Sequence, residues 1–124
     1  MTEKITVWGR ETELEIVFDC YGDEEPLPVQ QEALNAFLKD RDALLDDALT
    51  RIKEYCLQRD GDRIGGSVDN IFRYVKPKAL FLKRDSARRT VALLCAYRFD
   101  PENGLAAVFR DERFSAVGTE NIIL

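Results

Sequence analysis

The sequence contains no histidine. This absence removes every Ser–His and Cys–His nucleophile pair and every metal site that depends on imidazole ligands. Carboxylates and lysines remain available for acid–base chemistry, but the range of possible enzymes is much reduced. The cysteines show no spacing that indicates a zinc site. We therefore expect a protein that is not an enzyme and that carries no metal or other cofactor.

Cysteine is also scarce. The three cysteines, Cys20, Cys56 and Cys95, lie far apart, and each falls in an apolar or amphipathic pattern. They are predicted to be reduced, buried thiols, as is usual in a reducing compartment. No apolar run approaches the length needed to cross a bilayer, and the first residues lack the basic and then apolar pattern of a secretory signal. The sequence therefore predicts a cytoplasmic protein without a membrane partner.

The composition that remains is typical of a globular domain. The chain has 124 residues, of which 45% are hydrophobic and 33% charged. A single domain over residues 1–124 is the expected organisation, and it can bury roughly two thirds of the surface that the unfolded chain exposes. The net charge of −5 is unevenly spread, with a balance of −9 in residues 1–50 and +4 in residues 51–124. This asymmetry suggests a charged partner.

Hydrophobic patterns predict the elements along the chain. β-branched, alternating or continuous apolar segments predict strands at 4–8, 12–21, 79–82, 89–99, 105–109 and 114–117. Helical spacing predicts one helix over about 29–38, a second that begins after Asp40 and ends near Arg59, and a short third helix from Ser67 through Tyr74. Asp100–Gly104 is a predicted turn.

This order predicts an α+β fold. The expected sheet is antiparallel, with an N-terminal hairpin and a C-terminal meander, and two or three helices are expected to pack on one face. The continuous apolar character of residues 89–99 predicts a central strand that is covered on both faces. The residues expected to be buried between helix and sheet are Leu45, Leu49, Ile52, Leu93 and Phe109.

Acidic side chains gather in one segment near the N-terminus. They are Glu11, Glu13, Glu15, Asp19, Asp23, Glu24 and Glu25. The alternation predicts that Glu13, Glu15 and Asp19 share one strand face. An uncompensated acidic face could steer a basic partner to this surface. A solubilising edge strand that avoids aggregation through its charges explains the pattern equally well.

Two further motifs have features of phosphate sites. The basic stretch consists of Arg73, Lys76, Lys78, Lys83, Arg84, Arg88 and Arg89, with aromatic residues between them. Because nucleic-acid binders are usually basic overall, the acidic net charge favours a solvated face that pairs with the acidic half, and no nucleic-acid partner is predicted. The segment 61–66 is rich in glycine, but it follows a helix and lacks the Lys-Ser/Thr of a phosphate loop.

The C-terminal half resembles a group of small bacterial domains. The residues that carry the resemblance are Tyr97–Phe109, with its Asp-Pro-Glu and Gly-Leu, and the later Ala116-Val117-Gly118. Upstream, Gln30–Leu34, Tyr55 and the Pro-led segment 77–82 fit the same pattern. This group includes immunity proteins of bacterial toxin systems, among them contact-dependent growth inhibition. The resemblance implies no catalytic motif and no particular site residues.

Two functional hypotheses follow. The resemblance implies an immunity protein that binds and neutralises a cognate toxin by stoichiometric blockade, and the acidic segment predicts that the toxin presents a basic surface. The alternative is a small carboxylate-based hydrolase or ligand-binding domain of unknown substrate. A deep polar pocket with a carboxylate of raised pKa would favour the alternative, and a flat or protruding acidic surface would favour the binding protein.

Overall fold

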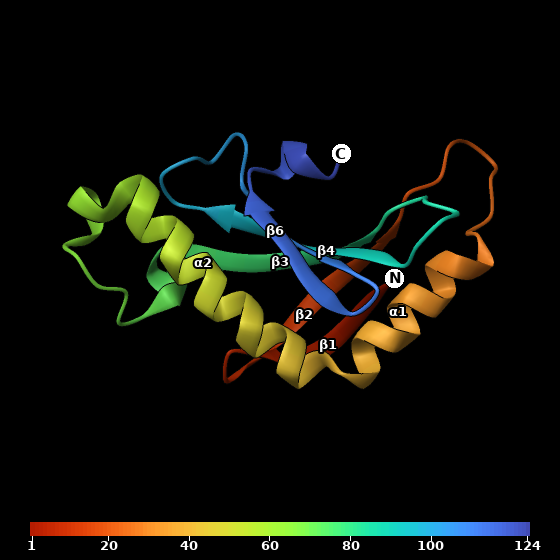
Figure 1. Cartoon of the computed structure of the whole chain (residues 1–124), viewed down its shortest axis with the longest axis horizontal. Coiled ribbons are helices and arrows are strands. Elements are labelled where there is room, and N and C mark those ends of the chain that lie inside the picture. Colours follow the sequence, from red (N-terminus) through yellow and green to blue (C-terminus); the bar gives the residue numbers. More distant parts are fainter.

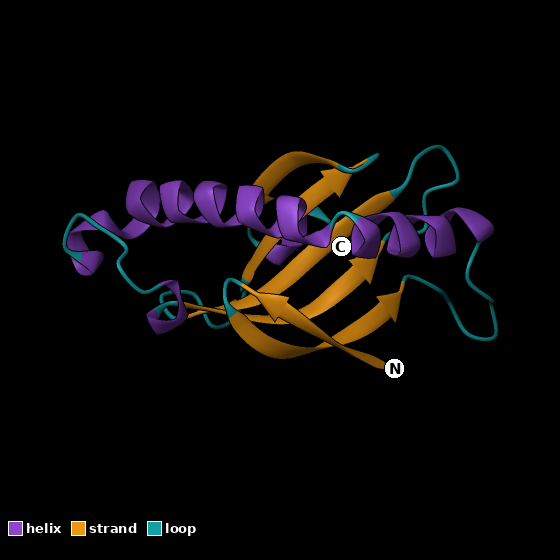
Figure 2. Ribbon diagram, turned by 90° about the horizontal axis from the view of Figure 1, so that it is seen from below, coloured by secondary structure: helices purple, strands orange, loops and turns teal.

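The computed structural model describes residues 1–124. Two helices lie against a six-stranded sheet (Figures 1 and 2), which confirms the predicted α+β class. The strands are β1 (Thr2–Val7), β2 (Arg10–Phe18), β3 (Val75–Leu82), β4 (Thr90–Tyr97), β5 (Leu105–Arg110) and β6 (Arg113–Gly118). The helices are α1 (Pro28–Lys39) and α2 (Arg41–Ile64), and two short 3₁₀ turns, η1 (Ile71–Arg73) and η2 (Glu120–Ile122), complete the chain.

The strands lie in the sheet in the order in which they occur in the sequence, β1 to β6. The N-terminal hairpin and the C-terminal meander are confirmed as antiparallel units. The sheet is mostly antiparallel, as predicted, and only β2 and β3 pair in parallel. The reason is topological: the helices return the chain to the end of the sheet where β2 began, so β3 runs in the same direction as β2.

Both helices cover the same face of the sheet (Figure 2), as predicted. The predicted end of the second helix near Arg59 coincides with a break in the helix at the next residue. Asp60 has non-helical dihedral angles (φ −132°, ψ 27°), which kink the helix, and α2 then continues until Gly65 ends it in the left-handed conformation (φ 90°). The last turns of α2 therefore project past the sheet in Figures 1 and 2.

The third helix is shorter than predicted. It is the single turn η1, and it is capped by Asn70, whose side chain accepts a hydrogen bond from the Phe72 N–H at 3.1 Å, and not by Ser67. Strand β3 correspondingly begins at Val75, earlier than the predicted 79, and it accommodates Pro77 beside a register shift between Pro77 and Ala79. A proline is tolerated there because the irregularity removes the need for a ladder hydrogen bond.

The main core lies between the helices and the sheet. Of the five residues predicted to be buried, Leu45, Ile52, Leu93 and Phe109 are at most 2% exposed, whereas Leu49 is only partly buried at the edge of this core. Phe109 makes an edge-on contact with Phe37 of α1, with ring centroids 5.4 Å apart. This contact fixes α1 against the middle of the meander.

A smaller apolar cluster covers part of the opposite face. It consists of Phe81, Ala92, Ala106, Val108 and Ile123. Ile123 follows η2, and the Lys83 ammonium donates a hydrogen bond to its carbonyl at 3.0 Å. Strand β4 is therefore covered on both faces, by the helices and by the C-terminal segment, as its continuous apolar sequence predicts.

One buried polar side chain fastens α1 to the sheet. The Gln30 amide nitrogen donates to the Leu82 carbonyl at 2.9 Å and to the Asp19 carbonyl at 3.1 Å, and the Leu27 N–H donates to the Gln30 side-chain oxygen at 2.7 Å. The side chain is 1% exposed. Its hydrogen bonds offset the cost of burying a polar amide. Neither helix is long and apolar enough to span a bilayer.

Candidate functional site

The acidic residues of β2 project from the face of the sheet that the helices leave uncovered. Leu14 and Ile16 alternate with them and enter the main core, so Glu11, Glu13 and Glu15 point the other way. All three glutamates are exposed. We refer to this group of three as the acidic face.

Strand β1, which pairs with β2, supplies little positive charge to compensate the glutamates of the acidic face. Glu11, Glu13 and Glu15 lie across from Thr6, Lys4 and Thr2 of β1. The Lys4 ammonium is 4.0 Å from Glu11, and both side chains are 72% exposed, so this pair contributes little stability. The Thr2 hydroxyl donates to Glu13 at 3.0 Å. Three carboxylates therefore face one lysine.

Asp19 is not part of the exposed acidic face, because its side chain is only partly exposed and makes contacts within the molecule. It follows the end of β2, where its carboxylate accepts a hydrogen bond from the Arg84 N–H at 3.1 Å and lies 3.8 Å from the Lys83 ammonium. Asp19 joins β2 to the segment after β3.

Asp23, Glu24 and Glu25 are exposed in the loop between β2 and α1. Glu24 accepts a hydrogen bond from the Tyr21 N–H at 2.8 Å and lies 3.5 Å from the Arg84 guanidinium. Arg84 also donates to the Glu25 carbonyl at 3.0 Å. The loop acids are thus separated from the acidic face, and one of them is already paired.

The basic stretch 73–89 divides into paired and unpaired side chains. The ion pairs are Lys78–Glu120 (3.5 Å), Lys83–Asp19 (3.8 Å), Arg84–Glu24 (3.5 Å), Arg88–Asp111 (3.9 Å) and Arg89–Glu112 (2.7 Å). The predicted pairing with the acidic N-terminal half is confirmed for Lys83 and Arg84. The other three cations pair with acids of the C-terminal half, and Arg73 and Lys76 make no ion pair.

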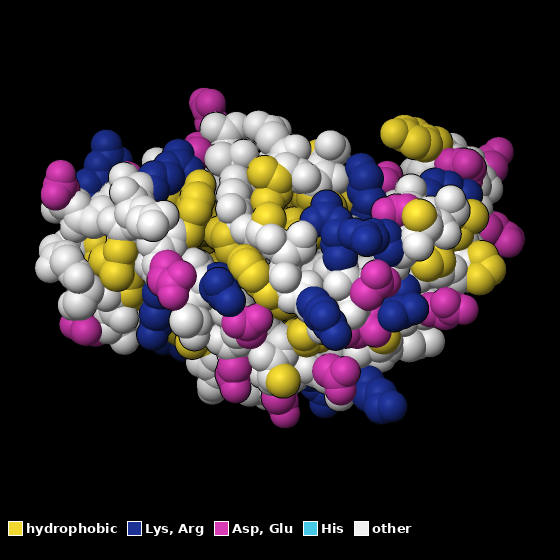
Figure 3. Space-filling model, viewed as in Figure 1, with side chains coloured by type: hydrophobic (Ala, Val, Ile, Leu, Met, Phe, Trp, Pro, Cys, Tyr) yellow, Lys and Arg dark blue, Asp and Glu magenta, His cyan; other side chains and the backbone are white.

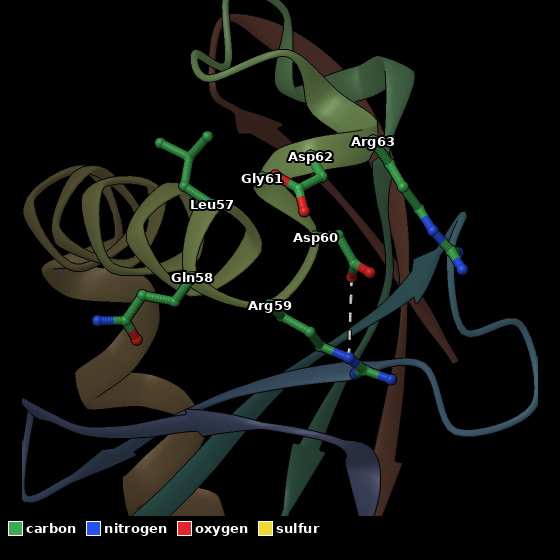
Figure 4. Close-up of a pocket in the computed structure, with 7 residues that line it drawn as sticks. All are labelled: Leu57, Gln58, Arg59, Asp60, Gly61, Asp62 and Arg63. Atoms are coloured by element: carbon green, nitrogen blue, oxygen red, sulfur yellow. Dashed lines mark ion pairs between the residues drawn. The ribbon is translucent and has the colours of Figure 1, made fainter.

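A polar network joins the kink of α2 to the end of β4. The Tyr97 hydroxyl donates to Asp60 at 2.6 Å, and Arg59 donates to Asp100 at 2.7 Å and to the Tyr55 hydroxyl at 3.1 Å. Figure 4 shows Arg59 and Asp60 extending toward the strands, with the dashed ion pair of 3.8 Å between them. The kink is what allows Asp60 to reach the tyrosine.

The network shifts the pKa values of its members. Burial, and then the hydrogen bond to Asp60, raises the pKa of Tyr97. The hydrogen bond from Arg59 holds the pKa of Asp100 below its usual value. A general acid would need a carboxylate shifted in the other direction. The nearby hollow is lined by residues 57–63 and has two carboxylates, Asp60 and Asp62 (Figure 4). Asp60 is held by the Tyr97 hydroxyl, and Asp62 is exposed.

The thiols differ in accessibility. Cys56 and Cys95 are buried, and burial is the main cause that raises the pKa of each. Cys20 is partly exposed, and the Arg84 guanidinium lies 3.3 Å from its sulfur. All three are free. No three acidic or cysteine side chains come together in a group that could hold a metal ion.

Sequence comparison places the chain in a family. The family profile described as "Domain of unknown function (DUF6985)" matches residues 1–124. The chain belongs to this family. Comparisons with curated proteins and with solved structures gave no match. The family assignment covers the whole described sheet and both helices, and it attaches no activity to them, so the functional argument depends on the surfaces of the molecule.

Proposed function

We propose that this DUF6985 protein is an immunity protein, which binds a cognate bacterial toxin in the cytoplasm and blocks it stoichiometrically. The observation that carries the proposal is the acidic face. Three exposed glutamates project from the side of the sheet opposite the helices, beside the edge strand β1, and Lys4 is the one cation that pairs with them. The resemblance of residues 97–118 to immunity proteins supports the same function.

The position of the acidic face suits a protein partner. The face is carried by a hairpin at one edge of the sheet, and β1 has no neighbour on its outer side. A stable complex buries about 800 Å² on each partner, a small part of the 7067 Å² of accessible surface of this chain. The glutamates would act mainly by steering a basic toxin surface to the hairpin, which raises the association rate.

Figure 3 shows another part of the surface, where charges of both signs are mixed. There, basic and acidic side chains are interspersed, with hydrophobic side chains visible between them. Interspersed charges of both signs produce a weaker field at a distance than charges of one sign. The acidic face is therefore the better candidate for long-range attraction of a basic partner.

The test combines binding with protection of cells. Where the gene next to this one encodes a toxin, its toxic domain is co-expressed with the chain to measure protection, and association of the two purified proteins is measured by surface plasmon resonance at low salt. We expect Glu13→Lys/Glu15→Lys to slow association several-fold and to reduce protection, with a smaller effect at high salt because charges are then screened. Asp19 is left unchanged, since it holds Lys83 and Arg84.

A matched control carries the same change of charge elsewhere. Asp46 and Glu54 of α2 are exposed and make no side-chain contact with a cation, so Asp46→Lys/Glu54→Lys should leave association within about twofold of the parent. Equal rates for the parent and the acidic-face variant would show that this face is not the interface. Growth arrest despite co-expression of the parent chain would contradict the immunity function itself.

A further inference from the structure

The unpaired cations of the basic stretch line a hollow on the molecule. Arg73, Lys76 and Arg98 surround a space of about 350 Å³ together with Tyr74, Ala96 and Pro101. We refer to this space as the basic hollow. It lies at the end of the β3–β4 pair, away from the three glutamates of the acidic face.

The local backbone brings these side chains together. Lys76 lies opposite Ala96 in the β3–β4 ladder, and the Arg98 N–H donates to the Tyr74 carbonyl at 2.8 Å, which continues the pairing beyond the strand ends. The single turn η1 places Arg73 immediately before Tyr74. The small Ala96 side chain leaves space between the longer ones. The hollow is thus formed by fixed backbone with flexible cationic side chains at its rim.

The charge of the basic hollow is uncompensated. Arg73, Lys76 and Arg98 are exposed, and none of them is within ion-pair distance of a carboxylate. No acidic residue lines the hollow. Asp100, which follows in the chain, is bound to Arg59 at 2.7 Å. In a chain with a net charge of −5, three neighbouring cations without acids repel one another, and an anion would relieve that repulsion.

An aromatic wall stands beside these cations. The Tyr74 ring stacks on Phe99, with centroids 5.8 Å apart and an angle of 27° between the rings. The Arg63 guanidinium lies 5.3 Å from the centroid of Phe99. These contacts hold the Tyr74 ring in place at the hollow. A planar group that enters the hollow could therefore stack on a ring whose position is already fixed.

We propose that the basic hollow binds a phosphate-bearing ligand of nucleotide size. Arg73, Lys76 and Arg98 hold the phosphates, for which arginine offers paired donors in the matching geometry. Tyr74 takes the flat ring of the ligand. The volume lies at the lower end of the range for small-molecule sites, about 300–1,000 Å³. A compact ligand is favoured over a nucleic-acid strand, because a strand is bound along an extended basic groove.

Isothermal titration calorimetry with ADP at low salt tests this site. We expect Arg73→Gln/Lys76→Gln/Arg98→Gln to weaken ADP binding at least tenfold, since all three phosphate contacts are lost. The matched control Lys39→Gln/Lys53→Gln/Arg113→Gln removes three cations that make no ion pair and lie outside the hollow. It changes the net charge equally and should stay within twofold. Urea unfolding of each variant checks that the fold is retained.

Two further ligands separate the parts of the site. Tripolyphosphate should compete with ADP and lose affinity in the triple variant, whereas adenosine alone should bind weakly. Tyr74→Leu should weaken ADP more than tripolyphosphate, and an equal effect on both would overturn the stacking assignment. The proposal is overturned if ADP does not bind at millimolar concentration, if the control loses as much affinity as the triple variant, or if a single-stranded oligonucleotide binds and ADP does not.

Discussion

Replacing Gln30 with leucine tests how α1 is attached to the sheet. In the parent, the Gln30 amide satisfies the Leu27 N–H and the carbonyls of Asp19 and Leu82. The Leu82 carbonyl keeps a second donor in the variant, the Asp19 N–H at 3.0 Å. Two backbone groups are therefore left without a partner.

The expected loss of stability follows from these two unpaired backbone groups. A buried polar group that loses its partner costs about 1–3 kcal/mol, and water can reach the partly buried Leu27 and reduce its share. We expect the free energy of unfolding to fall by about 2–4 kcal/mol for Gln30→Leu. For a chain of this length the melting temperature then falls by roughly 3–6 °C per kcal/mol.

The neighbouring residue provides the control. Gln31 is exposed on α1 and makes no side-chain hydrogen bond, so Gln31→Leu should change the free energy of unfolding by less than about 0.5 kcal/mol. Equilibrium unfolding in urea measures both variants, and an unchanged m-value would confirm that the unfolding transition is comparable. If Gln30→Leu is no less stable than Gln31→Leu, the amide does not fasten the helix and the reasoning is refuted.

The remaining predictions concern the core and the thiols. Ile52→Ala should lower the free energy of unfolding by about 2–5 kcal/mol, because Ile52 is fully buried. Leu49→Ala should lower it clearly less. Equal losses for the two variants in urea unfolding would contradict the burial described above. In the native protein a thiol reagent should modify Cys20 first. Cys56 and Cys95 should react only on unfolding, because burial both shields them and raises their pKa values. Mass spectrometry locates the label, and early modification of Cys95 would show that β4 is accessible.

Local sequence patterns predicted the elements whose signals are local. The alternation in β2 placed Leu14 and Ile16 in the core and Glu13 and Glu15 outside it. The turn after β4 was identified from its composition, and Gly104 there has a positive φ of 59°, with a side chain excluded by the Cys95 carbonyl 2.8 Å from the position of a Cβ. Such features depend on neighbours a few residues away, which a single sequence displays.

The missed features depend on contacts between distant segments. The parallel pairing of β2 with β3 joins residues more than sixty positions apart, such as Glu15 and Ala79. The continuation of α2 past Gly61 depends on the kink at Asp60 and its contact with Tyr97. A glycine ordinarily lowers helix stability by about 1 kcal/mol, so its local signal pointed to an earlier end.

In the candidate sites, too, the sequence predicted some features and the structure was needed for others. Composition alone located the acidic segment, but only the structure separates the exposed Glu13 and Glu15 from Asp19, which is held by the chain after β3. Likewise, the sequence grouped Arg73 and Lys76 with basic residues that the structure pairs with acids. Arg98 lies outside this stretch in the sequence, and the β3–β4 pairing brings it to the basic hollow.

The strand order has a consequence for how the chain folds. Strands β3 to β6 form a meander in which every pairing closes a short loop, and the β1–β2 hairpin also closes a short loop. Only the β2–β3 pairing must span both helices, so it closes the longest loop and has the largest entropic cost. The meander can therefore form early, with the hairpin joining it late. Until then, the apolar residues of β3 line an open sheet edge, and during this interval the chain is most exposed to aggregation.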